Sequence, residues 1–256
     1  MDKVRVEQVP EGVVVDRTWL KNKGMSASLV DYYIKRGYLE SVARGVYRRP
    51  GGMLKWQHLV YSLQILGFSL HVGGRSALEL KGRAHYLPLG GKEKIHLYCQ
   101  KKLPRWLFKI NVNVEFVEHS RAIFQGHSKL GVSNVLFGSW DWEINVSSPE
   151  RALFEMMADV PKKETFHMVD VVIEGAVTLR PDLINSLLVN CKNIKVKRLF
   201  LWFAQKYYHQ WFENVNLEQV DLGKGKRVVQ ENGKLDSKYL ITVPRDSDDR
   251  EEQSIF

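Results

Sequence analysis

Cysteine is scarce in this chain, and features that would place it in a membrane or outside the cell are missing. The only two cysteines, Cys99 and Cys191, lie far apart and lack the spacing of metal ligands. Such a chain is expected to hold reduced thiols, not a disulfide framework. No apolar run approaches the ~20 residues that a membrane helix needs. The charged N-terminus also lacks the apolar core of a signal peptide. We therefore expect a cytoplasmic protein with no membrane partner.

Motifs of hydrolytic and nucleotide-binding enzymes are also missing. The eight histidines form no HExxH-like pair, and the segment GKGKR at 223–227 lacks the spacing of a P-loop. The acidic residues are scattered, with Asp141 and Glu143 on an expected strand and Asp170 and Glu174 on an expected helix. A metal-dependent nuclease needs clustered carboxylates and a positioned water, so it is kept only as an alternative. We assign no catalytic residue, metal ligand or cofactor, and we expect a protein that is not an enzyme.

The residues that are abundant indicate a folded, basic protein. Hydrophobic residues make up 44% of the 256 positions and aromatic residues 11%, which is enough for a substantial core. There are 38 Lys and Arg against 29 Asp and Glu, for a net charge of +9. This excess favours a polyanionic partner such as nucleic acid, or else an acidic protein.

The most informative stretch runs from Val13 to Pro50. Asp16 or Thr18 can cap a short helix, and Gly24 suits the turn after it. A second helix is expected from about Ser26 to Arg36, or from two residues later, because Ser28 and Asp31 have capping-box spacing. Two short strands at 38–42 and 45–49 follow, around a turn at 43–45. This order is typical of a winged helix-turn-helix, which places one helix in the major groove of DNA.

The second helix has two distinct faces. Val30, Tyr33 and Ile34 have helical spacing and should pack inward. The outer face then offers hydroxyls and a cation that suit base edges and phosphates. Its predicted DNA contacts are Ser26, Ser28, Tyr32 and Lys35. On the hairpin, Arg44 at the tip and Arg48 on the return strand suit the minor groove or the phosphates. The alternatives are a small amphipathic domain that packs on the rest of the protein, and a helix-turn-helix that serves to bind another protein.

Helices and strands alternate in the middle of the chain. A helix is expected at 55–66, followed by a turn at 71–75 and a second helix capped by Ser76. The glycines of that turn could instead bind a phosphate, which is the weaker alternative. Strands at 94–100 and 110–117 alternate in polarity and predict a half-exposed antiparallel sheet. The window 81–109 holds eight Lys and Arg against one carboxylate, with Trp106 and Phe108 among them. Such a surface can stack bases, anchor a protein partner, or simply be solvated.

The last part of the chain is predicted to be mainly helical. A strand at 140–146 leads to a helix capped by Ser147, and further helices are expected at 166–174, 181–190 and 195–208. The last of these helices is basic, and we expect four of its side chains to extend into solvent: Lys195, Lys197, Arg198 and Lys206. A hairpin is expected at Asn232-Gly233. We predict an α+β protein with a winged-helix domain at 1–50, an α+β region at 53–146, and a helical region with a β-hairpin at 147–256. The last two regions form either two domains or one.

Taken in order, three segments resemble the AbiEi family of antitoxins and transcriptional regulators from AbiE-type abortive-infection toxin–antitoxin systems. The first ends in ARGVYRRPG. The second is GGRSALELKG, followed by strands and VSSPERALFEMM. The third is KVKRLFLWFAQKYY, followed by LGKGKRVVQENGKLDSKYLITVP. The resemblance covers most of the chain.

This resemblance carries expectations about function. It implies an autorepressor that binds double-stranded promoter DNA with inverted repeats through a winged helix. It also implies an antitoxin that counters a cognate nucleotidyltransferase toxin, with or without direct binding. Arg17, Lys21 and Arg36 fit phosphate contacts in such a domain. A pure protein-interaction module, binding through the basic sheet or the 195–208 helix, is the main alternative.

Overall fold

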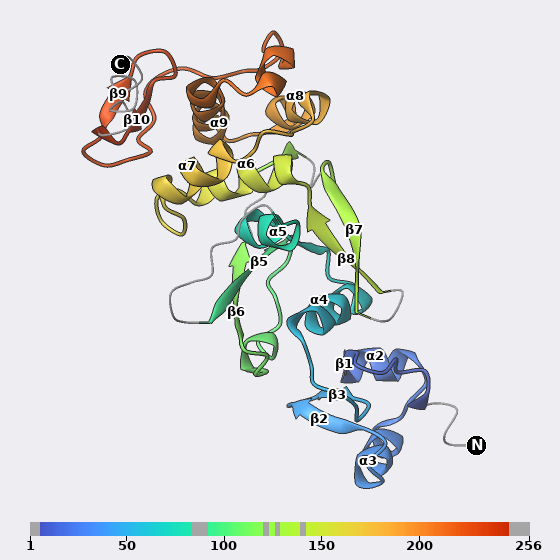
Figure 1. The fold of residues 1–256 in the computed structure, drawn as a ribbon. Helices are drawn as coiled ribbons and strands as arrows, with labels where there is room; N and C mark the ends of the chain where they lie inside the picture. The colour runs from blue at the N-terminus through green and yellow to red at the C-terminus, as the bar shows by residue number, and fades with distance from the viewer. Residues whose placement is uncertain (1–5, 83–91, 120–122, 126–128, 139–141, 246–256) are drawn as a thin grey trace. The chain divides into compact units, whose positions relative to one another are not determined.

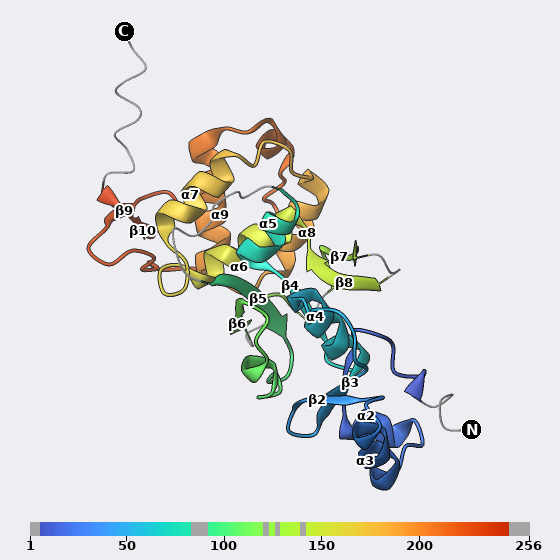
Figure 2. The same ribbon diagram turned by 60° about the horizontal axis from the view of Figure 1, so that its bottom comes forward.

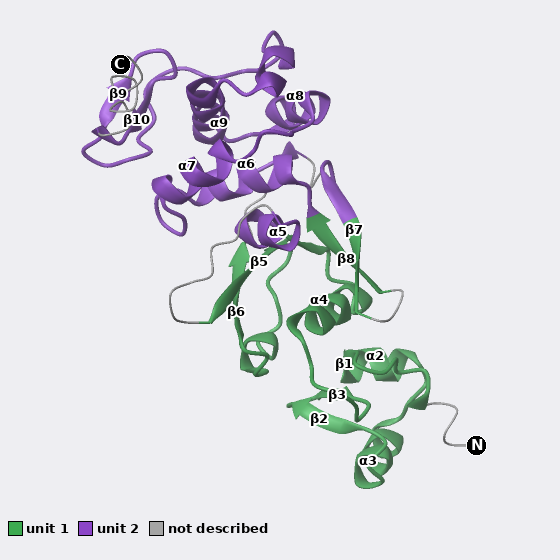
Figure 3. Ribbon diagram, viewed as in Figure 1, with its two compact units in different colours: residues 1–72, 87–121, 134–146 green, residues 73–86, 122–133, 147–256 purple. Residues whose placement is uncertain are grey.

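The chain folds into two compact units. In this computed structural model the described residues are 6–82, 92–119, 123–125, 129–138 and 142–245. Unit 1 comprises residues 1–72, 87–121 and 134–146, and unit 2 comprises 73–86, 122–133 and 147–256 (Figure 3). Helices and strands are mixed along the chain (Figures 1 and 2), which confirms the predicted α+β class.

The first five elements form a small helical layer with a three-stranded antiparallel sheet. They are β1 (Val14–Asp16), α2 (Arg17–Asn22), α3 (Ala27–Lys35), β2 (Glu40–Ala43) and β3 (Val46–Arg48). The strand order is β1-β3-β2. This arrangement is consistent with a winged-helix fold. Strand β1 was not predicted, because three residues are too few to show a period and its partner β3 lies some thirty positions away.

Local capping explains where the two helices begin. The Asp16 side chain accepts a hydrogen bond from the Trp19 amide at 2.8 Å, so Asp16 and not Thr18 is the cap of α2. Ser26 Oγ accepts from the Leu29 amide at 3.2 Å, so α3 starts early, as first predicted, and not after Ser28. Both caps satisfy a backbone donor that the first helical turn leaves free.

One hydrophobic core holds these elements together. Leu20 from α2 and Val30 and Tyr33 from α3 are almost completely buried in it. Helix α4 (Trp56–Ile65) adds Tyr61, which stacks on Trp142 with ring centroids 4.6 Å apart. Because Tyr61 and Trp142 also pack against the core, α4 and the strand that carries Trp142 belong to the same unit as the first five elements.

A mixed sheet of five strands follows. Its members are β4 (Leu70–Val72), β5 (Glu93–Cys99), β6 (Val114–His119), β7 (Val132–Phe137) and β8 (Trp142–Ser147). They lie in the order β6-β5-β4-β8-β7. Strands β4 and β7 were not predicted. The predicted strand positions of β5, β6 and β8 are correct within a few residues.

The pairing of β5 with β6 was predicted wrongly. They are parallel, with Glu93 opposite Val114 and Tyr98 opposite His119. Antiparallel neighbours can be joined by a tight turn, whereas parallel ones need a crossover of a dozen or more residues. Here the connection at 100–113 is long enough and contains the 3-10 helix η1 (Leu107–Lys109). Strand β5 is also buried continuously from Ile95 to Cys99, as an interior strand should be, and is not half-exposed.

Unit 2 is built around helix α6 (Pro149–Asp159), which is buried along most of its length. Four other helices pack on it, and Figure 1 shows them gathered there: α5 (Gly74–Leu80), α7 (Phe166–Glu174), α8 (Pro181–Asn190) and α9 (Ile194–Tyr207). The bounds of α7 and α8 agree with the prediction. No helix in the described part of the chain combines the length and the apolar character needed to cross a bilayer.

Two predicted helix caps in unit 2 are wrong. Ser148, not Ser147, caps α6, because its side chain accepts from the Arg151 amide. Ser147 Oγ instead donates to the Glu155 carboxylate at 2.8 Å. Helix α5 begins at Gly74, so Ser76 lies inside it and is buried. The Gly74 amide donates to the same Glu155 carboxylate at 3.0 Å, so a buried internal acid occupies the place considered for a phosphate.

The cations of α9 do not extend outward as predicted. Lys197 and Arg198 are buried at 4% and 3% exposure. The Arg198 guanidinium donates to the backbone carbonyls of Leu222, Gly223 and Gly225 at 2.6–3.0 Å. The segment 223–227 therefore turns its carbonyls toward a cation, whereas a phosphate loop turns its amides toward an anion. Lys195 and Lys206 are also engaged, on backbone carbonyls and on Asp170.

The last two described strands form a small hairpin that lies a few residues after its predicted position. Helix η3 (Gln210–Asn214) precedes it, and strands β9 (Lys234–Asp236) and β10 (Ile241–Val243) pair antiparallel. The two strands follow Asn232-Gly233 and do not flank it. Asn232 has a φ of +59°, so a turn does form there. That turn directs the chain into β9, and residues 237–240 make the connection to β10.

Candidate nucleic-acid interface

Helix α3 has one buried face and one exposed face. Val30 and Tyr33 are 1% and 0% exposed, as the spacing predicted. Ser28 and Lys35 are exposed, and Tyr32 keeps 38% of its surface. The side chains predicted to read DNA therefore lie on the outer surface of the helix, where a groove can reach them.

Short-range contacts order this exposed face. The hydroxyls of Ser26 and Ser28 lie 3.0 Å apart, and the Arg36 guanidinium lies over the Tyr32 ring at 5.5 Å. A cation–π contact at an exposed site contributes about 0.5–1 kcal/mol and keeps the arginine near the aromatic ring. Arg36 and Tyr32 are thus brought together as a pair on one side of α3.

Helix α2 contributes cations next to α3. Arg17 and Asp31 form an ion pair at 3.8 Å in which both side chains are more than half exposed. Such a pair adds little stability, so Arg17 can exchange Asp31 for a phosphate. Lys21 is exposed in the last turn of α2. Lys23 was not predicted as part of this surface, but its Nζ lies 5.4 Å from the centroid of the Trp19 ring. The i, i+4 spacing of Trp19 and Lys23 predicts that the two side chains are neighbours on the helix surface.

The turn between β2 and β3 presents Arg44. This residue is exposed, and Gly45 beside it adopts a φ of +74°, which a side chain would oppose. The Arg17 amide donates to the Gly45 carbonyl at 3.1 Å. The tip of the hairpin is therefore tied to the first residue of α2.

Arg48 has a different environment from the other candidates. Its Nε contacts the Glu40 carboxylate, and its Nη1 donates to the Gly52 carbonyl at 3.0 Å. Only 15% of its side chain is exposed. Glu40 lies directly opposite Arg48 in the β2–β3 register, a proximity that the strand pairing creates. Arg48 thus joins the two strands to the segment that follows them.

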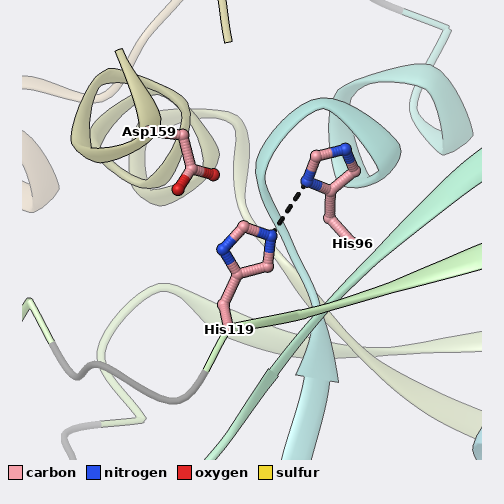
Figure 4. A group of neighbouring side chains, drawn as sticks. All are labelled: His96, His119 and Asp159. Atoms are coloured by element: carbon pink, nitrogen blue, oxygen red, sulfur yellow. Dashed lines mark hydrogen bonds between the residues drawn. The ribbon is translucent and has the colours of Figure 1, made fainter. Parts of the chain in front are cut away.

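Unit 1 also contains a buried pair of histidines. His96 Nδ1 and His119 Nε2 are 3.0 Å apart (Figure 4), and Tyr98 stacks on His119 with centroids 4.3 Å apart. The two imidazoles use ring nitrogens on each other. We therefore assign no metal centre to this pair.

Two of the carboxylates considered for a nuclease, Glu143 and Asp170, bind other side chains. Asp141 lies outside the described residues. Glu143 accepts a hydrogen bond from Asn134 Nδ2 at 2.7 Å. Asp170 accepts from Lys206 Nζ at 2.8 Å and from the Tyr207 hydroxyl at 2.7 Å, so its charge is already balanced. This geometry gives the nuclease alternative no support.

Comparisons with known proteins agree with this picture. Residues 3–89 match the family model described as transcriptional regulator, AbiEi antitoxin N-terminal domain. Residues 92–244 match the one described as transcriptional regulator, AbiEi antitoxin, type IV toxin–antitoxin system. A search of curated proteins found no match.

The fold is also found in a solved structure. The crystal structure of the RV2827C protein from Mycobacterium tuberculosis is similar, with a TM-score of 0.56 and 14% identity. The match covers 94% of this chain and 88% of that one. At this identity the likeness concerns the fold alone, whereas the two family models together span nearly the whole sequence. This chain therefore belongs to the AbiEi family of transcriptional regulators and antitoxins of type IV toxin–antitoxin systems.

Proposed function

We propose that this protein is a DNA-binding autorepressor that also counters a cognate nucleotidyltransferase toxin. The observation that carries the DNA-binding part is the exposed face of α3. Ser28, Tyr32 and Lys35 lie on it, on a helix whose opposite face buries Val30 and Tyr33. A rigid helix that displays hydroxyl, aromatic and cationic groups suits the edges of bases in a major groove.

The candidate residues then take three roles. Ser28, Tyr32 and Lys35 read bases, with Ser26 and Arg36 at either end of α3. Arg17 and Lys21 on α2 neutralise phosphates, and Arg44 enters the neighbouring minor groove. Arg48 supports the hairpin through Glu40 and contributes to DNA binding mainly by positioning Arg44. The domain at 1–50 performs recognition, and the protein acts in the cytoplasm where its DNA lies.

A binding titration tests this proposal. The probes are a duplex taken from upstream of the protein's own reading frame and a random-sequence duplex of equal length. We expect preference for the upstream duplex. The slope of log affinity against log salt concentration should be about −0.9 for each phosphate that the protein neutralises. Lys35→Ala with Arg44→Ala should remove the preference. Lys162→Ala with Lys192→Ala, two exposed lysines of unit 2, is the matched control.

The result that contradicts the proposal is clear. If the Lys35 and Arg44 double variant keeps full preference for the upstream duplex, the recognition surface is assigned wrongly. If the wild-type chain shows no preference at all, the repressor role itself is wrong. Neither result depends on the antitoxin activity.

The antitoxin activity is assigned to the chain after residue 52 and needs a separate test. Co-expression with a nucleotidyltransferase encoded next to this gene should restore growth. Co-purification of the two proteins at high salt would indicate direct binding, and rescue without it would indicate an indirect mode. The 195–208 helix is a poor surface for direct binding, because four of its cations are bonded within unit 2. We propose no enzymatic activity for this chain.

A further inference from the structure

The connection between β5 and β6 carries a concentration of positive charge that the winged helix does not explain. Residues 100–113 contain four cations and no Asp or Glu. The cations are Lys101, Lys102, Arg105 and Lys109. All four are exposed. Among the residues that the structure describes, none of the four forms an ion pair or a side-chain hydrogen bond. Their charges therefore face solvent without compensation from the protein.

The segment that carries these cations is held in place from within. Leu103 and Leu107 are 2% and 0% exposed, so both side chains of the connection are buried in the protein. The Leu103 amide donates to Glu118 Oε1 on β6 at 3.0 Å. The backbone amide of Lys109 donates to the Trp106 carbonyl at 3.0 Å and closes the 3-10 helix η1. With the two leucines buried, the four cations beside them remain exposed.

A fixed backbone with uncompensated outward cations is suited to a polyanion. Ordering long side chains on binding has an entropic cost, and a preorganised backbone reduces the part that comes from the main chain. Each phosphate that a cation neutralises also releases its bound counterions, and this release increases the affinity of the complex. The segment lies in unit 1, the same compact unit that holds α2 and α3.

We propose that the 100–113 connection is a second DNA-binding surface, which contacts the phosphates of duplex outside the sequence read by α3. The inference rests on the proposed function, because it takes the duplex bound by the winged helix as its partner. The surface would add affinity and length of contact without adding sequence preference, since phosphates carry no sequence information. Its ligand is therefore the duplex backbone and not a particular base.

The test compares two variants with the same loss of charge. One replaces Lys101, Lys102, Arg105 and Lys109 with Gln. The other replaces four exposed lysines of unit 2 with Gln: Lys162, Lys192, Lys224 and Lys226. Both variants of the full chain are titrated with the upstream duplex and with a random-sequence duplex of about 60 base pairs, over a range of salt. Thermal unfolding checks that each variant is folded.

The expected result is a difference in the salt slope. At about 0.9 per phosphate, the connection variant should lose up to roughly 3.5 from the slope of log affinity against log salt, on both duplexes. At moderate salt its affinity should fall at least about tenfold. The unit 2 variant should change the slope by less than about one. The ratio of affinities for the two duplexes should stay as in the wild type for the connection variant.

Three results would overturn the inference. Equal slopes for the two variants would mean that only net charge matters. Loss of preference for the upstream duplex in the connection variant would make this surface part of sequence reading. Tighter binding to single-stranded RNA than to duplex, abolished by Phe108→Ala, would point to base stacking by the half-exposed Phe108 instead. Absence of any preference in the wild type, by contrast, refutes the proposed function and not this surface alone.

Discussion

Glu150 and Arg180 are joined by three hydrogen bonds across 30 positions of the chain. The Arg180 backbone amide and Nε both donate to Glu150 Oε1 at 3.0 Å, and Nη2 donates to Oε2 at 2.9 Å. The Glu150 side chain is 3% exposed while that of Arg180 is 65% exposed. The first turn of α6 is thereby connected to the residue that precedes α8.

This pair makes the unfolding free energy of unit 2 depend on pH. Burial alone would raise the pKa of Glu150, but hydrogen bonds outweigh it and lower the pKa to about 2, with the Arg180 side chain contributing most and the Glu150 and Arg180 amides and Ser148 the rest. A carboxyl whose pKa is lowered by folding stabilises the protein above its unfolded value, near 4.5, and loses that contribution as the pH falls toward 2. Glu150→Gln should therefore cost about 1–3 kcal/mol at pH 7.

Urea unfolding at pH 7, 4 and 3 measures this effect. The difference in unfolding free energy between wild type and Glu150→Gln should be largest at pH 7 and shrink through the acid range. A difference that stays constant with pH would show that the carboxylate charge is not what stabilises the pair. Asp182→Asn, an exposed acid in the first turn of α8, is the control.

Arg198 makes a second, testable contribution to unit 2. Its guanidinium donates to carbonyls of the 222–225 segment at several points at once. Lysine cannot reproduce that planar set of donors, so carbonyls would be left without partners. We expect Arg198→Lys to lower the unfolding free energy by about 2–4 kcal/mol, as measured by thermal unfolding.

Lys224→Gln is the matched control for Arg198→Lys. Lys224 lies in the same segment but is exposed, so its loss should change stability by less than about 0.5 kcal/mol. Equal effects of the two substitutions would show that the carbonyl contacts of Arg198 stabilise the fold no more than an exposed lysine does.

Tyr32 and Tyr33 separate DNA binding from stability. They are neighbours in α3, yet Tyr32 is 38% exposed and Tyr33 is 0% exposed. Tyr33→Ala should destabilise the domain by about 3–5 kcal/mol, because it leaves a cavity in the core. Tyr32→Ala should leave stability within about 1 kcal/mol of wild type and weaken binding to the upstream duplex.

Parallel thermal unfolding and mobility-shift titrations on the two variants provide the measurement. A folded Tyr32→Ala protein that binds DNA as tightly as wild type would remove Tyr32 from the interface. Tyr32→Phe separates the ring, which contacts Arg36, from the hydroxyl.

Gly233 is required by a close approach of two backbones. A Cβ at this position would lie 2.3 Å from the Val243 carbonyl oxygen, so any side chain must displace the β9–β10 pairing. Gly233→Ala should lower the melting temperature by several degrees, whereas Gly52→Ala, where a Cβ meets nothing within 4 Å, should be nearly neutral. Equal melting temperatures would show that the hairpin can move aside.

Several features of this protein followed from the sequence by itself. Two candidate caps for α2, Asp16 and Thr18, the bounds of α7 and α8, and the inward face of α3 all depend on residues within a few positions of one another. Capping and helical periodicity are local, so they can be predicted without knowing the fold. The exposed candidates Ser28, Tyr32 and Lys35 followed from the same periodicity.

Only the tertiary structure decided the remaining features. The parallel pairing of β5 with β6 and the burial of Lys197 and Arg198 join segments far apart in the chain. The engagement of Arg48 by Glu40 depends on the register of the β2–β3 hairpin. A cation becomes internal when distant carbonyls or a cross-strand carboxylate reach it, and no local pattern records that meeting. The same holds for the basic connection at 100–113, where the burial of Leu103 and Leu107 determines which way its charges face.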